Sequence, residues 1–291
     1  MVAEDSQIFL FADDTKVHRK INSEADKKIL QQDINSLLMW SELWLLKFHP
    51  DKCIYMGIGY MKDKEIYTTY EMDGHILKRS TCEKDLGVYI DDELKFDTHI
   101  SNIVNKANRN LAIVRKTFDY MDCTTFNYIF KGLIRPHLEY AAPIWSPHHI
   151  KQKEILENVQ RRATKMVPGL AQLSYSERLK KLKLPTLAYR RIRGDMIQVY
   201  KLTSGCYDSS VPSLLTHSTT GLRGHSKKLY ITRSDKDIRK YNFSVRVQKI
   251  WNSLPDQVVN AKDIINFEKS LDSYWSDQEI MYDNFKADIR P

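Results

Sequence analysis

The sequence lacks any apolar run that approaches the roughly 20 residues a membrane-spanning helix requires, and its mean hydropathy is −0.49. These two absences exclude an integral membrane protein. The first residues carry neither a basic start nor a long apolar core, so we expect no secretory signal and an intracellular protein, cytoplasmic or nuclear. The four cysteines are far apart and form no Cys-x-x-Cys pair, which argues against a disulfide framework.

Several common signatures of enzymes are also missing. The sequence contains no Walker-type glycine loop, no G-x-S-x-G and no H-E-x-x-H, which argues against the enzyme classes that use these motifs. It has no repeat of fixed period and no low-complexity tract, so repeat architectures are excluded as well. With 42% hydrophobic and 28% charged residues, the composition is that of a folded chain of one large or two modest domains.

What the sequence does have is positive charge, and this charge is concentrated. The 45 Lys and Arg exceed the 37 Asp and Glu, giving a net charge of +8. Residues 106–202 hold 19 of the basic residues and only 7 acidic ones, so the rest of the chain is net acidic. This segment is predicted to contact a phosphate backbone through sequence-independent attraction. Composition equally allows a set of solvated helix faces.

The first third of the chain reads as short strands around one long helix. Residues 7–12 and 15–21 are predicted to form strands joined by a tight turn at the adjacent aspartates. Ser23 is a predicted helix N-cap, followed by apolar residues at helical spacing until Pro50. Further strands are expected at residues 52–60, 65–77 and 85–90, with Asp73-Gly74 as a hairpin turn.

The remainder of the chain is predicted to be mostly helical. Apolar residues at helical spacing indicate a helix over 100–118, and Pro136 and Pro168 are expected to end two more. A strand at 228–232 and two short helices are expected near the C-terminus. The predicted helices are 100–118, 124–135, 151–167 and 186–202.

The chemical motif is the tetrapeptide Phe11-Ala12-Asp13-Asp14, at the end of an apolar strand. Two adjacent carboxylates repel each other unless a cation lies nearby. Mg²⁺ prefers carboxylate and phosphate oxygens, and it promotes phosphoryl transfer. Taken alone, the motif is more typical of an ordinary surface turn.

Motifs spread along most of the chain occur in a characteristic order. They are FADD at 11–14, WLLKFHPDKC at 44–53, EKDLGV at 83–88 with LKF at 94–96, RPHLEY at 135–140, ENVQRRATK at 157–165, RLKKL at 178–182 and WNSLP at 251–255. In this order they resemble the reverse transcriptase of LINE-type (non-LTR, jockey-like) retrotransposons. The resemblance covers its late palm motifs, primer-grip hairpin, thumb and C-terminal signature.

The resemblance implies an RNA-directed DNA polymerase, a nucleotidyltransferase that acts on an RNA template and a DNA primer with Mg²⁺. Asp13 would be a direct metal ligand and Asp14 a weaker one. Lys52 would stabilise the leaving pyrophosphate. Contacts to template and primer are expected from Leu86, Gly87, Lys106, Arg109, Lys116, Arg161, Arg162 and Lys165.

The sequence departs from the family pattern in the part of the polymerase that forms the catalytic site. The family needs a further carboxylate from an earlier palm strand, together with the fingers, and only ten residues precede Phe11. His49 stands where the family usually has Asn. We therefore expect a truncated fragment that is inactive alone. The alternatives are a non-catalytic nucleic-acid-binding remnant that uses the basic helices, and a remnant that folds poorly.

The expected fold is α+β. It comprises a truncated palm (hairpin, helix and small antiparallel sheet) with an exposed sheet edge that a partner could cover. A mostly helical thumb and a small C-terminal module follow. The expected domains are 1–97 as the partial palm with the FADD and primer-grip-like hairpins, 98–203 as the basic thumb-like region, 204–224 as a linker or loop, and 225–291 as the C-terminal module.

Overall fold

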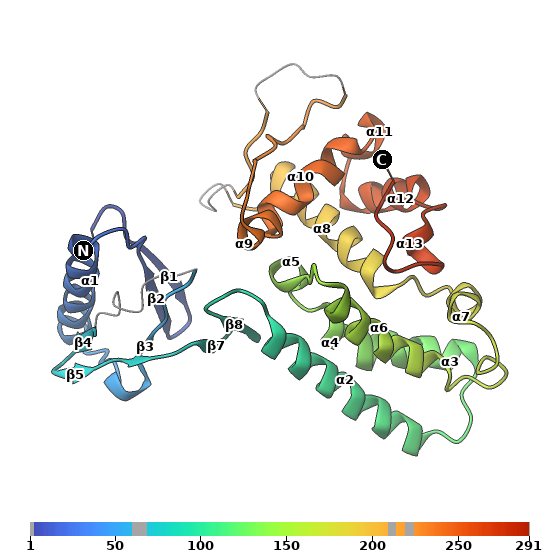
Figure 1. Ribbon diagram of the computed structural model, residues 1–291, viewed down its shortest axis with the longest axis horizontal. Coiled ribbons are helices and arrows are strands. Elements are labelled where there is room, and N and C mark those ends of the chain that lie inside the picture. Colours follow the sequence, from blue (N-terminus) through green and yellow to red (C-terminus); the bar gives the residue numbers. More distant parts are fainter. Residues whose placement is uncertain (1–2, 60–68, 209–213, 219–223, 291) are drawn as a thin grey trace. The chain divides into compact units, whose positions relative to one another are not determined.

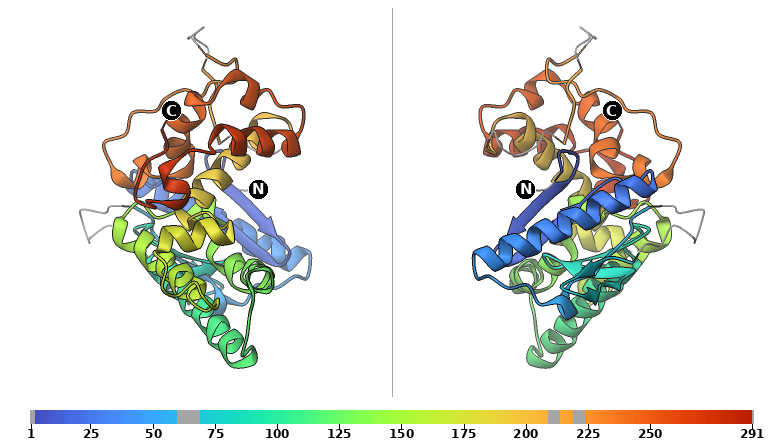
Figure 2. Two further views of the ribbon diagram at one scale, coloured as in Figure 1. Left: turned by 90° about the vertical axis from the view of Figure 1, so that its right-hand side faces the viewer. Right: turned by 90° about the vertical axis from the view of Figure 1, so that its left-hand side faces the viewer.

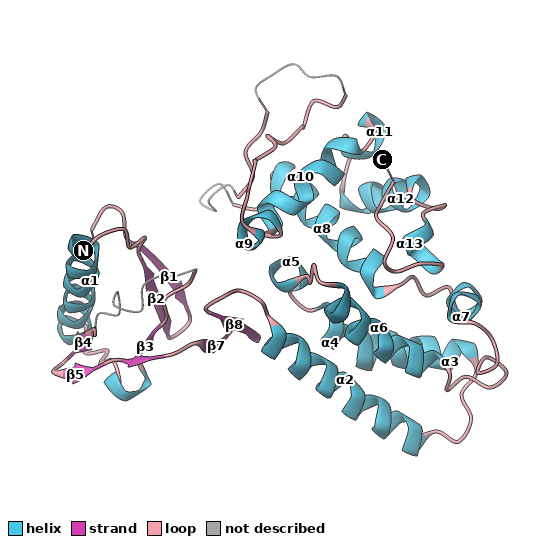
Figure 3. Ribbon diagram, in the orientation of Figure 1, coloured by secondary structure: helices cyan, strands magenta, loops and turns pink. Residues whose placement is uncertain are grey.

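Two units make up the chain in the computed structural model, which describes residues 3–59, 69–208, 214–218 and 224–290 (Figure 1). Unit 1 is Met1–Asp85 with Ile90–Glu93, and unit 2 is Leu86–Tyr89 with Leu94–Pro291. Helices and small sheets both occur, and the helices dominate unit 2 (Figure 3). The assignment of palm and thumb to these units stays a prediction, as do the domain roles.

A hairpin opens unit 1. Strands β1 (Gln7–Phe11) and β2 (Asp14–His18) pair antiparallel, with Phe11 opposite Asp14. Ala12 and Asp13 form the turn, and Ala12 has a φ of 52°, which is uncommon for a residue with a side chain. The predicted hairpin is confirmed, and the hairpin is drawn in blue together with α1 in Figure 2.

Helix α1 (Glu24–Leu43) begins at the predicted N-cap. The Ser23 side chain accepts a hydrogen bond from the backbone N–H of Asp26, and the Asp26 side chain accepts one from the backbone N–H of Ser23. This reciprocal capping box satisfies two donors that a helix start otherwise leaves unpaired. One face of α1 packs on a small core, formed by Ile34, Tyr70, Met72 and Leu77.

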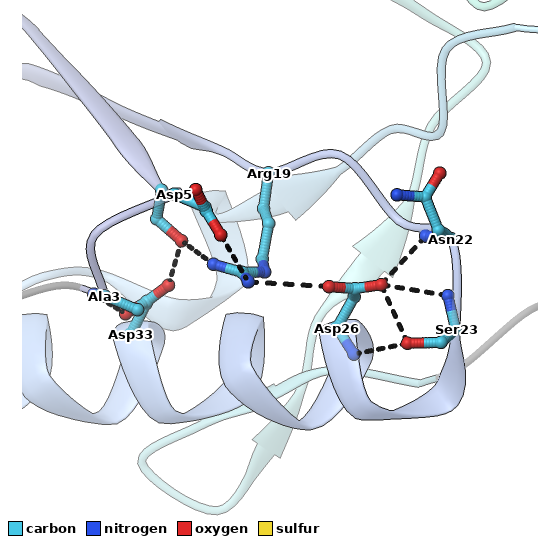
Figure 4. A network of polar contacts seen from close by, with 8 residues as sticks. Ala3, Asp5, Arg19, Asn22, Ser23, Asp26 and Asp33 are labelled. Carbon is cyan, nitrogen blue, oxygen red and sulfur yellow. Dashed lines mark hydrogen bonds and ion pairs between the residues drawn. The ribbon is translucent and has the colours of Figure 1, made fainter.

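Polar contacts fix the base of the hairpin on α1 (Figure 4). Arg19, just after β2, donates to the Ser6 hydroxyl at 3.1 Å and contacts the Asp26 carboxylate at 3.4 Å. Ser6 in turn donates to the buried Asp33 carboxylate, which also accepts from the backbone N–H of Ala3 at 2.7 Å. The base of the hairpin is therefore held by side chains, while its turn extends away from them.

Short strands complete unit 1. The Asp73-Gly74 turn joins β4 (Glu71–Met72) and β5 (His75–Ile76), so the predicted hairpin is confirmed. Two expectations were wrong. The strand expected over 52–60 is only β3 (Ile54–Tyr55), which follows a 3₁₀ turn at Pro50–Lys52. It pairs parallel with β6 (Lys78–Arg79), so the small sheets are not all antiparallel. Part of the strand expected over 65–77 lies outside the described residues.

The chain passes between the units at the two-stranded sheet of β7 (Cys82–Asp85) and β8 (Val88–Asp91). A continuous strand was expected over 85–90, and this was wrong. Leu86 and Gly87 instead form the turn, with φ values of 43° and 88°. Two successive residues with positive φ are what a tight hairpin turn requires.

The first helices of unit 2 follow the predicted pattern, with one correction. Pro136 does not end a helix. A π-helical turn (Phe130–Ile134) precedes it, and Pro136 lies in the first turn of α4, which continues directly from that turn. The helices of this part are α2 (Asp97–Thr117), α3 (Cys123–Ile129), α4 (Arg135–Glu139), α5 (Ala142–Trp145), α6 (Ile150–Thr164), α7 (Tyr175–Leu182) and α8 (Leu187–Thr203).

The C-terminal part packs on α8 and contains more helices than expected. Its core includes Trp251, Phe267 and Trp275, all almost completely buried. The strand expected at 228–232 is wrong, because only an isolated bridge joins His217 and Leu229. Leu215, within the segment expected to be a linker, is buried in this core. The helices are α9 (Asp237–Lys240), α10 (Phe243–Ser253), α11 (Asp256–Val259), α12 (Ile264–Tyr274) and α13 (Glu279–Tyr282).

Across the part of the chain that the structure describes, no helix has both the length and the apolar content needed to cross a membrane.

Candidate nucleic-acid interface

The aspartate pair lies at the tip of the first hairpin. Asp13 is in the turn and Asp14 begins β2, and both are exposed. Asp5, a nearby acidic residue in sequence, is at the opposite end of β1, where it contacts Arg19 at 3.7 Å. A strand of five residues separates the two ends by about 16 Å. The hairpin therefore keeps Asp5 away from Asp13.

Within the described residues, the hairpin supplies two of the carboxylate ligands that the magnesium site of the resembled family needs. Asp13 and Asp14 supply the oxygen ligands that Mg²⁺ prefers. However, no group of three or more His, Cys, Asp or Glu side chains in the described residues is placed to hold a metal ion. Among the residues that the structure describes, Asp13 and Asp14 thus have no third acidic, histidine or cysteine ligand beside them.

Lys52 is exposed at the end of the 3₁₀ turn Pro50–Lys52. Within the described parts of the chain, no hydrogen bond or ion pair links it to Asp13 or Asp14. The structure therefore does not join the three expected catalytic residues into one site, and the catalytic role of Lys52 stays a prediction.

Leu86 and Gly87 form the turn of the β7–β8 hairpin, and Tyr140 packs over it. The Tyr140 hydroxyl donates to the Leu86 carbonyl oxygen at 2.9 Å. A Cβ atom built on Gly87 would lie 3.2 Å from the Tyr140 ring. Gly87 is thus required both by its φ of 88° and by this close contact.

Replacing Gly87 with alanine is expected to lower the free energy of unfolding of unit 2 by about 1–2 kcal/mol, because a side chain is strained in the left-handed region. Urea unfolding followed by tryptophan fluorescence measures this change. The matched control is Gly194→Ala in the interior of α8, where nothing lies within 4 Å of the new methyl group. This control is expected to be stabilising. An equal effect of both substitutions would contradict the requirement for glycine in the turn.

Helix α2 presents three expected contact residues to solvent. Its buried stripe is formed by Ile100, Val104, Ala107, Leu111 and Val114. Lys106, Arg109 and Lys116 are exposed. Burial lowers the pKa of His137, and the positive charge of Lys106 acts in the same direction.

The other three expected contact residues lie together. Arg161 and Arg162 are in the last turn of α6, and Lys165 follows it. Together with Asn158, Tyr175 and Arg178 they line a depression of about 490 Å³, which we call the basic depression. Arg162 is oriented by donating to Asn108 of α2 at 2.8 Å. Sequence analysis missed Tyr175 and Arg178 as site residues, although Arg178 begins the RLKKL motif.

Ion pairs neutralise some cations of the basic segment, but not those of the basic depression. Arg193 donates to the Asp272 carboxylate at 2.5 and 2.8 Å, and Arg190 pairs with Glu139. In contrast, none of the four cations that line the basic depression forms an ion pair with a described carboxylate. Carboxylates distant in sequence thus neutralise some cations of the positive segment, but the four cations of the basic depression form no ion pair with a described carboxylate.

Comparison with known proteins points to mobile elements. The chain is 25% identical over 204 residues to the RNA-directed DNA polymerase from mobile element jockey of Drosophila melanogaster, a match that covers 67% of this chain and 21% of that protein. It is 22% identical over 140 residues to the probable RNA-directed DNA polymerase from transposon BS of the same species, covering 46% and 16%. The chain is a distant, partial relative of transposon RNA-directed DNA polymerases.

This relationship covers only part of each protein, because the matches span about a fifth or less of the two polymerases. An uncharacterised protein of Caenorhabditis elegans is 21% identical over 138 residues, covering 46% of this chain and 70% of that protein. No protein-family model matches the chain. No solved structure matches it significantly.

Proposed function

We propose that this chain is a nucleic-acid-binding segment of a non-LTR retrotransposon reverse transcriptase, matching its late palm, thumb and post-thumb regions. Its partners are an RNA template and a DNA primer, bound mainly through their phosphates. The observation that carries this proposal is the basic depression, where four cationic side chains from α6, α7 and Lys165 converge and form no ion pair with a carboxylate in the described residues. The distant similarity to transposon polymerases supports it.

The chemistry of the depression suits phosphate groups. Three of its four cations are arginines, whose planar guanidinium groups can donate two hydrogen bonds to one phosphate. Binding of this kind releases counterions, so the affinity falls steeply as salt increases. The exposed Lys106, Arg109 and Lys116 of α2 would add further phosphate contacts.

The double substitution Arg162→Gln/Lys165→Gln is expected to weaken binding to an RNA–DNA primer-template by at least about tenfold at moderate salt and to reduce the salt slope by about two. Both side chains are exposed, so folding is not expected to change. Fluorescence anisotropy over a series of salt concentrations measures both quantities.

The matched control is Lys249→Gln/Lys269→Gln, which removes the same charge from exposed positions on α10 and α12. We expect this control to keep the affinity within about twofold. Equal losses in both double variants would mean that net charge, and not the basic depression, determines binding. Absence of salt-dependent binding by the unsubstituted chain would remove the proposed function.

We further propose that the polypeptide of these 291 residues does not polymerise by itself. Asp13 and Asp14 have no third acidic ligand beside them in the described residues, and loss of a correctly placed metal ligand is expected to cost a factor of about 100 or more in rate. Primer extension with Mg²⁺ and nucleotides tests this. Template-dependent synthesis above the level of an Asp13→Ala control would contradict it.

The first hairpin offers an edge at which a partner strand could add, and we propose that it does. In the described residues, β1 and β2 pair only with each other. An unpaired strand edge is a template for another strand. Hydrogen–deuterium exchange of the isolated chain is expected to show fast exchange at those β1 amides that point away from β2. Protection of every amide from Gln7 to Phe11 would mean that this edge is already covered.

A further inference from the structure

Two arginines of the basic depression are held in fixed positions. Arg178 is only 4% exposed. It donates to the Thr164 hydroxyl at 3.0 Å and to the Leu173 carbonyl oxygen at 2.5 Å. The Arg161 guanidinium carbon lies 5.1 Å from the centre of the Tyr175 ring and 5.1 Å from that of Phe285. These contacts orient both guanidinium groups before any ligand arrives.

Tyr175 provides the platform between the two arginines. The Arg178 guanidinium carbon lies 5.5 Å from the centre of the same ring. The ring is held at its hydroxyl end, because the hydroxyl donates to the buried Glu157 carboxylate at 2.5 Å and accepts from Gln160 at 3.1 Å. Aromatic rings attract cations through their faces, so one ring stabilises two positive groups side by side.

The positive charge of the depression is balanced only in part, by the attraction of the Glu154 and Glu157 carboxylates to Arg161. None of the described carboxylates forms an ion pair with the four cations, since Glu154 pairs with Lys286 at 2.6 Å, Glu157 accepts from Tyr175 at 2.5 Å and Glu177 caps the start of α7. Burial lowers the pKa of Arg178, and repulsion from Arg161 adds to this effect. The Arg161 Nε atom is also buried without a hydrogen-bond partner in the described residues. An anion in the depression would relieve the repulsion between the two arginines.

We infer that the basic depression is a preorganised site for a phosphate group with two or more negative charges, such as a diphosphate or the phosphorylated 5′ end of a strand. This inference rests on the proposed function and refines its ligand. A group with two or more negative charges places more charge at one point of the depression than a single phosphodiester of a strand does.

Calorimetric titration with inorganic pyrophosphate tests the site directly. The unsubstituted chain is expected to bind it, and Lys165→Gln and Arg162→Gln are each expected to weaken binding at least tenfold. Lys249→Gln, an exposed lysine on α10, is the matched control and is expected to bind as the unsubstituted chain does. Arg178→Gln should abolish binding, but its burial makes a folding check by circular dichroism necessary. Absence of pyrophosphate binding, or equal binding by Lys165→Gln, would overturn the inference.

Strand binding separates this inference from the proposed function. Two DNA strands of one sequence, with a 5′ phosphate or a 5′ hydroxyl, are compared by anisotropy. We expect the phosphorylated strand to bind at least fivefold more tightly, and this preference to disappear in Lys165→Gln. Salt-dependent binding without preference would overturn the inference and leave the proposed function intact. Pyrophosphate binding without binding of either strand would support the phosphate site and contradict the proposed nucleic-acid-binding function.

Discussion

Replacing Asp195 with alanine is expected to lower the free energy of unfolding of unit 2 by about 3–5 kcal/mol, the usual cost of breaking a buried ion pair. Asp195 on α8 accepts two hydrogen bonds from Arg246 on α10, at 3.0 and 2.9 Å. Arg246 also donates to the carbonyl oxygens of Pro143 at 2.8 Å and Tyr241 at 3.1 Å. Without Asp195, the positive charge of Arg246 would stay largely buried and would lose the carboxylate that balances it.

Urea unfolding followed by tryptophan fluorescence measures this loss, because Trp145, Trp251 and Trp275 are all buried in unit 2. The matched control is Asp283→Ala, which removes an exposed pair with Lys180 at 2.5 Å. Exposed pairs contribute less than about 1 kcal/mol. The double variant Asp195→Ala/Arg246→Ala is expected to lose less than the sum of the single losses. Similar effects of Asp195→Ala and Asp283→Ala would show that the buried pair does not hold α8 and α10 together.

Lowering the pH from 7 to about 4 is expected to destabilise unit 2 by about 3 kcal/mol through His99 alone. Burial lowers the pKa of His99 from 6.5 to about 4. Its Nδ1 atom accepts the backbone N–H of Tyr89 at 3.3 Å, and its ring packs on Trp145 with ring centres 5.1 Å apart. The neutral ring thus links β8 to the start of α2, and protonation would remove the acceptor.

The direction of this pH effect follows from proton binding. Below pH 6.5 the unfolded chain takes up a proton at His99, whereas the folded chain does so only near pH 4. The contribution of His99 to the free energy of unfolding is therefore fully present above pH 6.5 and is lost as the pH falls from 6.5 to about 4. His99→Gln keeps an acceptor for Tyr89 and should remove most of the decline. Burial also lowers the pKa of His137, His148 and His225, so some pH dependence should remain.

His137→Gln is the matched control for His99→Gln. His137 is half-buried, so this substitution is expected to change the pH dependence by less. The unfolding free energy of each variant is measured by urea titration from pH 4 to pH 7. An unchanged decline in His99→Gln would contradict the assignment to this ring.

Local signals in the sequence predicted the elements that depend on local physics. The capping residues Ser23 and Asp26 fixed the start of α1, because a helix start must satisfy its own N–H groups. The apolar spacing from Ile100 to Val114 predicted α2, because a stripe at helical period can be buried on one side only. Pro136 misled the prediction, because the π-helical turn before it could not be recognised from residue types.

The candidate site shows where such signals stop. The FADD motif predicted a hairpin with two carboxylates at its turn, and the structure has that hairpin. A third ligand depends on which distant side chains meet there, and in the described residues none does. Likewise, the family resemblance implied that Arg161, Arg162 and Lys165 contact nucleic acid, whereas Tyr175 and Arg178 join them only through the packing of α7 on α6.

By itself, the sequence determined the positive charge of residues 106–202, the main helices and the similarity to transposon polymerases. Only the tertiary structure decided which of those charges remain available. Arg193 and Lys180 are neutralised by Asp272 and Asp283, which lie 79 and 103 residues away along the chain. Charges attract through space and not along the sequence, so the unpaired arginines of the basic depression could be identified only after the chain had folded.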